Sequence, residues 1–119
     1  MEKKLNFKKY KKKICFDLDG VLCKTYKNFY KNSIPIKSNI KKINYLFDQG
    51  NYIFIYTSRY MGRNNDNKLK AKKIGYKFTK TQLNSWGVKF HKLIMGKPSY
   101  DIIIDDKSID YKKNWKIKI

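Results

Sequence analysis

The fold is decided by the stretch Ile14-Cys15-Phe16-Asp17-Leu18-Asp19-Gly20-Val21-Leu22, where an apolar run leads into two carboxylates and a glycine. Because Asp and Gly are poor strand formers, a strand over Ile14–Phe16 is expected to end at Asp17. In an open α/β sheet, ligands bind at the edge formed by the carboxyl ends of the strands. The stretch therefore predicts a buried strand that delivers two acidic side chains to that edge.

The length and composition limit the class of protein. With 119 residues the chain has room for one domain, which we place at residues 13–119 after a basic lead-in at residues 1–12. No run of about 18 apolar residues exists, and the basic start lacks the apolar stretch of a secretory signal. We therefore expect a cytoplasmic protein in which Cys15 and Cys23 are reduced thiols, with Cys15 a small core residue.

The formal net charge of +20 permits two interpretations. The chain holds 27 lysines but two arginines, and it is rich in Ile, Asn, Tyr and Phe, which A/T-rich codons also encode. This pattern indicates a composition bias that places lysine at solvated positions. Alternatively, the positive field is a selected surface that attracts polyanions such as nucleic acid. Both interpretations favour partners that carry phosphate, and we prefer a phosphorylated small molecule over nucleic acid.

Hydrophobic patterns after the first strand predict helices and strands in alternation. Pro35 is expected to open a helix that Gly50 terminates. The continuous apolar run over residues 52–56 predicts a buried parallel strand. Further expected elements are helices over 67–74 and 80–86, the second capped by Thr79, strands over 90–95 and 100–104, and an edge strand over 115–119. The alternation predicts an α/β fold, a single Rossmann-like domain with a mainly parallel sheet flanked by helices.

Acidic and hydroxyl side chains follow three of the expected strands. Of only nine acidic residues, four lie in two tight pairs: Asp17/Asp19 and Asp105/Asp106. Thr57 follows another strand, and Lys97 joins the group if its turn lies at the same edge. Since the carboxyl ends of parallel strands share one edge, these side chains should converge. The set suits phosphoryl transfer through a covalent intermediate.

Each member of this set has a role in breaking a phosphate ester. Asp17 would attack phosphorus, and Asp19 would protonate the leaving oxygen and later activate water. Two carboxylates repel a phosphate, so a hard divalent cation is needed, and oxygen ligands favour Mg²⁺. The expected metal ligands are Asp17, the backbone carbonyl of Asp19, Asp105 and Asp106. The expected phosphate ligands are Thr57, Ser58, Lys97 and Gly20, whose small size lets the backbone turn beside the phosphate.

Non-catalytic interpretations of the same residues stay open. The run Asp17-Leu18-Asp19-Gly20 could be part of a calcium loop, although Asn28 stands where that loop needs Glu, or it could be a bare turn. Thr57 could cap a helix, and Asp105 with Asp106 could start a loop.

Two further polar residues are left without a catalytic role. Arg59 suits either a surface position or a contact near the substrate. His91 is the single histidine, and it is expected to be packed or exposed rather than catalytic.

The ordered motifs resemble the haloacid dehalogenase (HAD) superfamily of Mg²⁺-dependent phosphatases. The matching residues are Phe16 to Leu22 for the first motif, Ile55-Tyr56-Thr57-Ser58-Arg59 for the second, Lys97 for the third, and Ile103-Ile104-Asp105-Asp106 with Asp110 for the fourth. They span residues 14–110 in the order that the superfamily has. The resemblance implies a HAD-type fold, an aspartyl-phosphate intermediate on Asp17 and Mg²⁺-dependent hydrolysis of phosphomonoesters.

A narrower resemblance lies in the run from Thr81-Gln82-Leu83 to Gly96-Lys97-Pro98-Ser99-Tyr100-Asp101. It is similar to short phosphatases that are often encoded beside capsule and surface-polysaccharide genes, which implies a small sugar or polyol phosphate as substrate. One alternative is a polynucleotide 3′-end phosphatase. An alternative of another class is a non-enzymatic basic module that binds polyanions.

Two departures from the pattern of the superfamily stand out. Only two residues separate Lys97 from the strand expected to start at Tyr100, where the superfamily usually has a whole helix. Four extended residues span at most ~14 Å, so Lys92 and Lys107 are alternatives to Lys97 as the phosphate ligand. The loops around the site leave room for a minimal cap or none. The site is therefore expected to be open, or covered by a second copy in a homo-oligomer.

Overall fold

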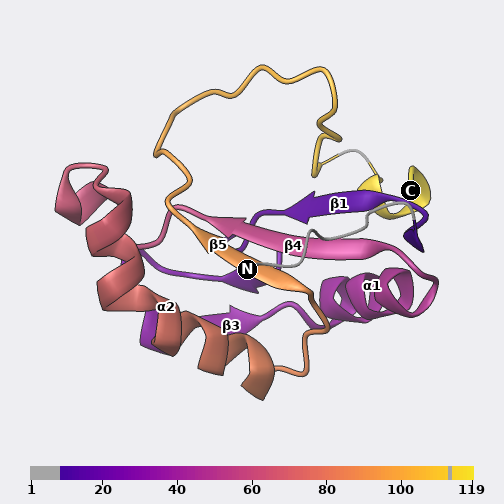
Figure 1. Cartoon of the computed structure of the whole chain (residues 1–119), viewed down its shortest axis with the longest axis horizontal. Helices are drawn as coiled ribbons and strands as arrows, with labels where there is room; N and C mark the ends of the chain where they lie inside the picture. The colour runs from indigo at the N-terminus through magenta and orange to yellow at the C-terminus, as the bar shows by residue number, and fades with distance from the viewer. Residues whose placement is uncertain (1–8, 113) are drawn as a thin grey trace, which may run out of the picture.

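A parallel three-stranded sheet forms the centre of the protein, in the order β1-β4-β5 (Figure 1). The computed structural model describes residues 9–112 and 114–119. The strands are β1 (Lys13–Phe16), β4 (Tyr52–Thr57) and β5 (Lys92–Met95). Phe16 pairs with Ile55, and Ile55 pairs with Leu93. This pairing confirms the α/β class with a parallel sheet.

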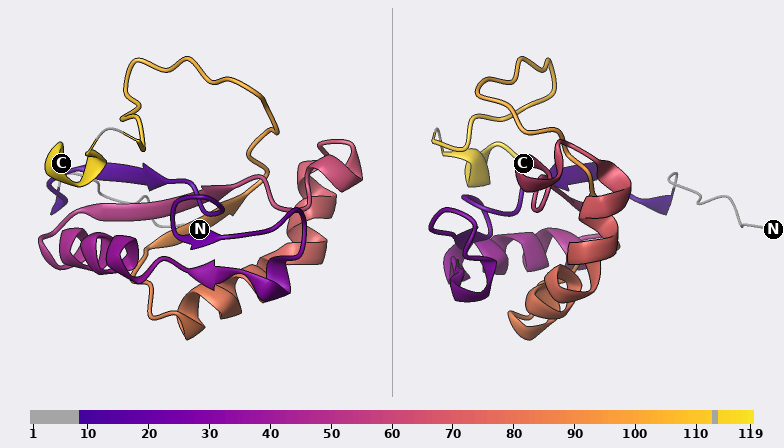
Figure 2. Two further views of the ribbon diagram at one scale, coloured as in Figure 1. Left: turned by 180° about the vertical axis from the view of Figure 1, so that it is seen from behind. Right: turned by 90° about the vertical axis from the view of Figure 1, so that its left-hand side faces the viewer.

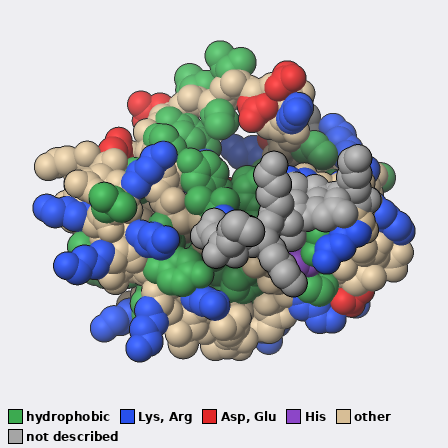
Figure 3. Space-filling view, in the orientation of Figure 1, with side chains coloured by type: hydrophobic (Ala, Val, Ile, Leu, Met, Phe, Trp, Pro, Cys, Tyr) green, Lys and Arg blue, Asp and Glu red, His purple; other side chains and the backbone are tan. Residues whose placement is uncertain are grey.

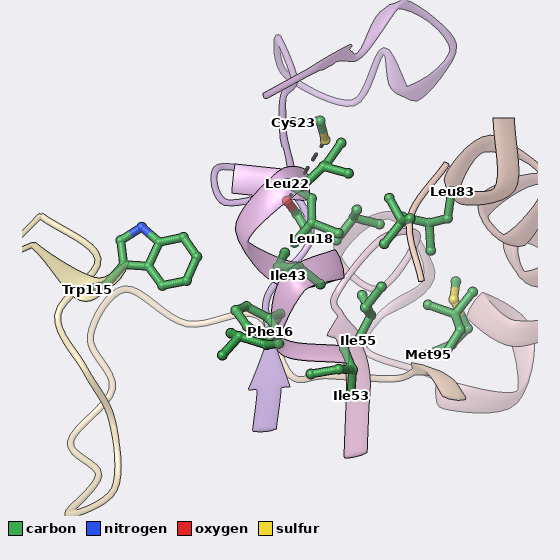
Figure 4. Close-up of a cluster of buried hydrophobic side chains, with 14 residues drawn as sticks. Phe16, Leu18, Leu22, Cys23, Ile43, Ile53, Ile55, Leu83, Met95 and Trp115 are labelled. Atoms are coloured by element: carbon green, nitrogen blue, oxygen red, sulfur yellow. Dashed lines mark hydrogen bonds between the residues drawn. The ribbon is translucent and has the colours of Figure 1, made fainter. Parts of the chain in front are cut away.

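Two helices connect the strands. Helix α1 (Lys37–Asp48) lies between β1 and β4 in the chain, and α2 (Lys68–Ser85) lies between β4 and β5. Both connections step in the same direction across the sheet, so right-handed crossovers place the two helices on one face. Figure 4 shows the side chains that fill the core, among them Phe16, Leu18, Ile43, Ile53, Ile55, Leu83 and Met95. Neither helix of the described ranges is long and apolar enough to cross a membrane.

The described residues before β1 extend the pairing of the sheet. The backbone N–H of Lys11 donates to the carbonyl of Gly50 at 2.9 Å, and the N–H of Tyr52 donates to the carbonyl of Lys12 at 2.7 Å. Residues 11 and 12 of the expected lead-in therefore continue the β1–β4 ladder as part of the domain. Residues 1–8 of that lead-in lie outside the described residues.

Short elements occupy the loop between β1 and α1. Strands β2 (Cys23–Lys24) and β3 (Ile34–Pro35) pair in antiparallel fashion, with the 3₁₀ turn η2 (Tyr30–Asn32) between them. Pro35 lies opposite Cys23 in this pair, and Ile36 is the N-cap of α1. The expectation that Pro35 opens the helix is therefore wrong by two residues.

Helix α2 is one continuous element where the sequence predicts two. Asn67 caps its start by accepting a hydrogen bond from the N–H of Lys70 at 3.1 Å. Gly75, which locally indicates a helix end, lies inside the helix, where the absence of a side chain lets the ring of Tyr60 approach. Thr79 is buried in the helix interior and caps nothing. Packing against the loop after β4 thus overrides the low helix propensity of glycine.

The strand predicted over 100–104 does not form in the described chain. The segment instead belongs to an arc, residues 97–112, that leaves the end of β5 and passes beyond the outer edge of β1 (Figures 1 and 2). Ile102, Ile103 and Ile104 are 81%, 53% and 96% exposed. Because no described strand pairs with the outer side of β1, that strand is an edge, and Cys15 is exposed rather than part of the core.

The tail also differs from its predicted form. Residues of the expected edge strand form the 3₁₀ turn η4 (Trp115–Ile117), and a further such turn, η3 (Gly62–Asn64), follows β4. Trp115 is 8% exposed and meets Phe16 edge to face, with the ring centroids 5.8 Å apart (Figure 4). The tail therefore folds so that this large ring is buried, rather than extending as a strand with alternate side chains exposed.

Replacing Gly75 with alanine should destabilise the protein, because the added Cβ would collide with the ring of Tyr60. The gain of ~1 kcal/mol in helix propensity is smaller than the ~1–3 kcal/mol typical of overpacking. Gly62→Ala is the matched control, since its added Cβ meets no atom within 4 Å. Urea denaturation should give a lower free energy of unfolding for Gly75→Ala only, and equal values for both variants would contradict the contact.

His91, the single histidine of the chain, should make the free energy of unfolding depend on pH near neutrality. Its Nδ1 accepts a hydrogen bond from the N–H of Ile53 at 3.0 Å, and its ring stacks on Phe47 and Tyr52. Desolvation, together with the charge of Lys9, lowers the pKa of His91. Its contribution is therefore present above pH ~6.5 and is lost as the pH falls below that value. The melting temperature should drop between pH 7.5 and 5, and less so in His91→Asn; parallel curves would rule this contribution out.

Candidate functional site

The carboxyl edge of the sheet brings together three of the predicted site residues, Asp17, Thr57 and Lys97. Asp17 follows β1, Thr57 ends β4, and Lys97 lies two residues after β5. The backbone N–H of Lys97 donates to the carbonyl of Thr57 at 3.1 Å, and its Nζ lies 3.4 Å from Oδ2 of Asp17. A carboxylate and an ammonium group therefore face each other where α/β sheets bind ligands.

The Asp17–Lys97 pair is only partly withdrawn from water. The side chain of Asp17 is 40% exposed, and that of Lys97 is 13% exposed. Partial burial lowers the pKa of Lys97, but a hydrogen bond with Tyr100 and the charge of Asp17 outweigh it and raise that pKa above its ordinary value. Lys97 is therefore a full positive charge at neutral pH, able to attract a phosphate oxygen beside the carboxylate.

Backbone geometry shapes the rest of this edge. Gly20 has a φ of +90°, which favours glycine, and its N–H donates to the carbonyl of Cys23 at 2.8 Å to close the turn after Asp19. Thr57 is 1% exposed, and its Oγ1 accepts a hydrogen bond from the N–H of Arg59 at 3.1 Å. Ser58 follows half-buried. The hydroxyl of Thr57 is therefore buried, and it binds the backbone at the start of the loop that follows β4.

Asp19 is held in a partly buried ion pair that the sequence motifs did not indicate. Its Oδ2 accepts from Nε of Arg59 at 2.9 Å, and its Oδ1 accepts from Nη2 at 2.9 Å and from the hydroxyl of Thr25 at 2.5 Å. Arg59 has no exposed side-chain surface, donates from Nη1 to Gln82 of α2 at 2.6 Å, and lies over the ring of Tyr30. The pair thus ties the loop after β1 to α2.

One sequence signal could have identified Arg59 as a structural centre. In a chain where 27 of 29 basic residues are lysine, an arginine is retained against the compositional trend. Only a guanidinium offers the planar fork that binds both oxygens of a carboxylate while stacking on an aromatic ring. The location of Arg59 directly after Thr57 and Ser58 then points to the carboxyl edge of the sheet.

Asp105 and Asp106 lie on the arc, where they do not form a metal-binding group with other described residues. Both are exposed, and Oδ1 of Asp105 accepts from the N–H of Lys107 at 2.8 Å, as in the alternative that this pair starts a loop. Among the described residues, no three His, Cys, Asp or Glu side chains come together in a way that could hold a metal ion. The predicted ligand set of Asp17, Asp19, Asp105 and Asp106 is therefore not assembled here.

The other candidates lie away from this edge. The Nδ1 of His91 contacts the start of β4, at the opposite edge of the sheet. Lys92 begins β5 at that same opposite edge, so it does not replace Lys97 beside Asp17. Lys97 is thus the lysine that the described structure brings to the nucleophile candidate.

Comparisons with known proteins support the fold. No protein-family model and no curated protein matches the chain. A crystal structure from Vibrio cholerae, described only as a target, is similar to this chain with a TM-score of 0.77 and 27% sequence identity, over 82% of each of the two chains. The similarity concerns the arrangement of the sheet and helices, and it assigns no activity.

Removing the charge of Arg59 should destabilise the protein strongly. In Arg59→Met, the Asp19 carboxylate would lose its partner at a site where it is only 29% exposed, and breaking buried pairs costs about 3 kcal/mol. Arg63→Met is the matched control, because Arg63 also lies over the rings of Tyr30 and Tyr60 but is exposed. The free energy of unfolding in urea should fall by several times more for Arg59→Met. Similar losses in both variants would show that ring contacts, and not the ion pair, carry the effect.

Proposed function

We propose that this protein is a HAD-type phosphomonoester hydrolase whose nucleophile is Asp17. The observation that supports this most directly is the position of Lys97 Nζ, 3.4 Å from the Asp17 carboxylate at the carboxyl edge of a parallel sheet. A partly exposed carboxylate can attack phosphorus, and the neighbouring ammonium can balance the charge of the phosphoryl group that arrives.

The reaction proceeds in two displacements. An oxygen of Asp17 attacks phosphorus, the ester P–O bond breaks with its electron pair going to the leaving oxygen, and that oxygen takes up a proton. Water then attacks the aspartyl phosphate, releases inorganic phosphate and restores the carboxylate. Lys97 binds the non-bridging phosphate oxygens in both steps. The other proposed phosphate ligands, Thr57, Ser58 and Gly20, lie along the same edge of the sheet.

Asp19 is the proposed proton carrier for both displacements. It lies two residues after the nucleophile, within the turn that Gly20 closes. Both of its oxygens accept hydrogen bonds from Arg59, but among the described residues Oδ2 accepts from Nε alone and keeps a second lone pair that can carry the proton. Arg59 acts as a positioning residue that holds Asp19 in one orientation.

The HAD resemblance also implies Mg²⁺ as a cofactor. The acidic side chains of the described residues do not fit the ion as they are arranged, since no three of them come together. The two displacements above therefore use only the side chains at the carboxyl edge.

The proposed substrate is a small sugar or polyol phosphate. A polynucleotide 3′-end is the second candidate, favoured by the formal charge of +20 and by the exposure of Asp17. The two differ in their dependence on salt, because binding to a polynucleotide releases counterions and weakens steeply as salt rises.

Replacing Asp17 with asparagine should abolish phosphatase turnover, with a fall of at least ~10³-fold in kcat/KM. The control is Asp48→Asn, because Asp48 is an exposed carboxylate paired with Lys89 on the far end of α1. Turnover is measured on an aryl phosphate, a panel of sugar phosphates and a 3′-phosphorylated oligonucleotide, each with and without Mg²⁺. Absence of turnover on every ester would refute the hydrolase, and equal activity of Asp17→Asn would refute the nucleophile.

The salt dependence of the active substrate separates the remaining alternatives. Activity on the oligonucleotide alone that is lost above ~0.2 M salt would favour the polynucleotide phosphatase. Binding of the oligonucleotide by both wild type and Asp17→Asn, without turnover, would favour the non-enzymatic polyanion-binding module.

A further inference from the structure

A small cavity lies between the loop that precedes α1 and the loop that follows β4. Its volume of about 270 Å³ is below the ~300–1,000 Å³ of pockets that enclose drug-sized ligands. Phe29, Tyr30 and Tyr60 supply aromatic walls, and Lys31 and Arg63 supply positive charge. No acidic side chain of the described ranges lines it. The cavity therefore suits a single small ring that carries negative charge.

Both arginines of the chain lie over the ring of Tyr30, one wall of this cavity. The Cζ of Arg59 is 4.7 Å from the ring centre, and the Cζ of Arg63 is 5.5 Å from it. Arg59 also binds Asp19, the proposed proton carrier. The cavity is thus one aromatic ring away from the site of the proposed reaction. Because lysine fills almost every other basic position, two arginines at one ring indicate a local need for the guanidinium group.

Tyr60, a second wall of the cavity, has an unfavourable backbone conformation. Its φ is +68°, in the left-handed region that bulky residues rarely adopt. Its ring packs against Gly75, and the ring centres of Tyr60 and Tyr30 are 4.9 Å apart. Strained residues of this kind cluster at binding and catalytic sites, where the surrounding structure holds them in place. The strain at Tyr60 therefore favours a binding role for this wall.

The guanidinium group of Arg63 has unused capacity for hydrogen bonds. Its Nη2 donates to the carbonyl of Asn28 at 3.2 Å, whereas a guanidinium carries five N–H donors. Within the described part of the chain, no carboxylate forms an ion pair with it. Figure 3 shows further Lys and Arg side chains over α2, the helix that follows Arg63 in the chain. A field of this sign raises the local concentration of anionic ligands.

We infer that this cavity binds the leaving group of the substrate, and that Arg63 binds a second anionic group on it. The inference rests on the proposed function, because the phosphate attacked by Asp17 fixes one end of the substrate. The two guanidinium groups cannot be further apart than the sum of their distances to the ring centre of Tyr30. A hexose with a substituent at each end covers that range. The substrate is therefore a sugar phosphate that carries a second phosphate, or a carboxylate, across the ring from the first.

The aromatic walls favour a sugar over a nucleobase in this cavity. Guanidinium groups already lie over the ring of Tyr30, and that of Arg63 lies over the ring of Tyr60 as well. A planar base would have to displace a guanidinium in order to stack on these rings. A carboxylate or phosphate instead binds the planar edge of Arg63 and leaves the stacking in place.

Chemical modification of Arg63 tests the inference without turnover. Phenylglyoxal reacts with exposed arginines, and the side chain of Arg59 has no exposed surface, so mass spectrometry should find the adduct on Arg63. The experiment uses Asp17→Asn, in which the esters should stay intact. At equal concentrations, glucuronate 1-phosphate and glucose 1,6-bisphosphate should slow the modification about 10-fold more than glucose 1-phosphate, since only they reach Arg63 with a charged group. Equal protection by all three, or protection by none, would overturn the inference.

Steady-state kinetics test the same residue in the active protein. The kcat/KM for glucuronate 1-phosphate should exceed that for glucose 1-phosphate by about 10-fold or more in the wild type. This ratio should fall close to unity in Arg63→Met. Arg63→Lys should keep part of it, because an ammonium supplies the charge without the planar fork.

The matched control for these kinetics is Lys41→Met, which removes an exposed charge on α1, away from the cavity. It should keep the wild-type ratio. An unchanged ratio in Arg63→Met, or an equal loss in Lys41→Met, would overturn the inference.

The two measurements separate a failure of the anion site from a failure of the proposed function. Selective protection of Arg63 without turnover of any ester supports the site and refutes the hydrolase. Turnover without discrimination between the two sugar phosphates, and without selective protection, supports the hydrolase and overturns the site. Protection by a nucleoside 3′,5′-bisphosphate but by neither sugar compound would assign the cavity to a polynucleotide end, and it would overturn the sugar.

Discussion

The ion pair between Arg59 and Asp19 is the interaction on which the arrangement of this protein depends. A guanidinium with no exposed surface binds the carboxylate after β1, the amide of Gln82 in α2 and the ring of Tyr30 in the intervening loop. Removing such a group from water is costly, and only its full set of hydrogen bonds offsets the cost. Three segments are therefore fixed at once, and the position of Asp17 follows from the anchoring of Asp19 two residues later.

The sequence allowed the α/β class to be predicted because alternation of strands and helices is a local property of the hydrophobic pattern. The converging polar residues Asp17, Thr57 and Lys97 could be predicted as well, since parallel strands must end at a common edge. Both predictions use information that lies within a few residues of each element. They do not depend on which distant segments meet.

The features that escaped prediction depend on contacts between distant segments. Gly75 is read locally as a helix end, and only the approach of Tyr60 explains a glycine inside a continuous helix. The isoleucines at 102–104 have the composition of a buried strand, but a strand forms only if its connections can reach an open edge. Likewise, the burial of Trp115 against Phe16 joins residues from both ends of the described chain. No local pattern contains that information.

The pairing of the sheet has a consequence for how the chain folds. In the three-stranded sheet, each neighbouring pair of strands is separated in sequence by an entire helix. The contact between Phe16 and Trp115 joins residues that are separated by most of the chain. Loops of this size must close before the strands can form their stabilising contacts. Closing them costs conformational entropy, so chains with such topology fold slowly. During that interval the isoleucine-rich arc stays exposed and can contact other molecules. This exposed apolar segment therefore sets a concentration above which folding competes with aggregation.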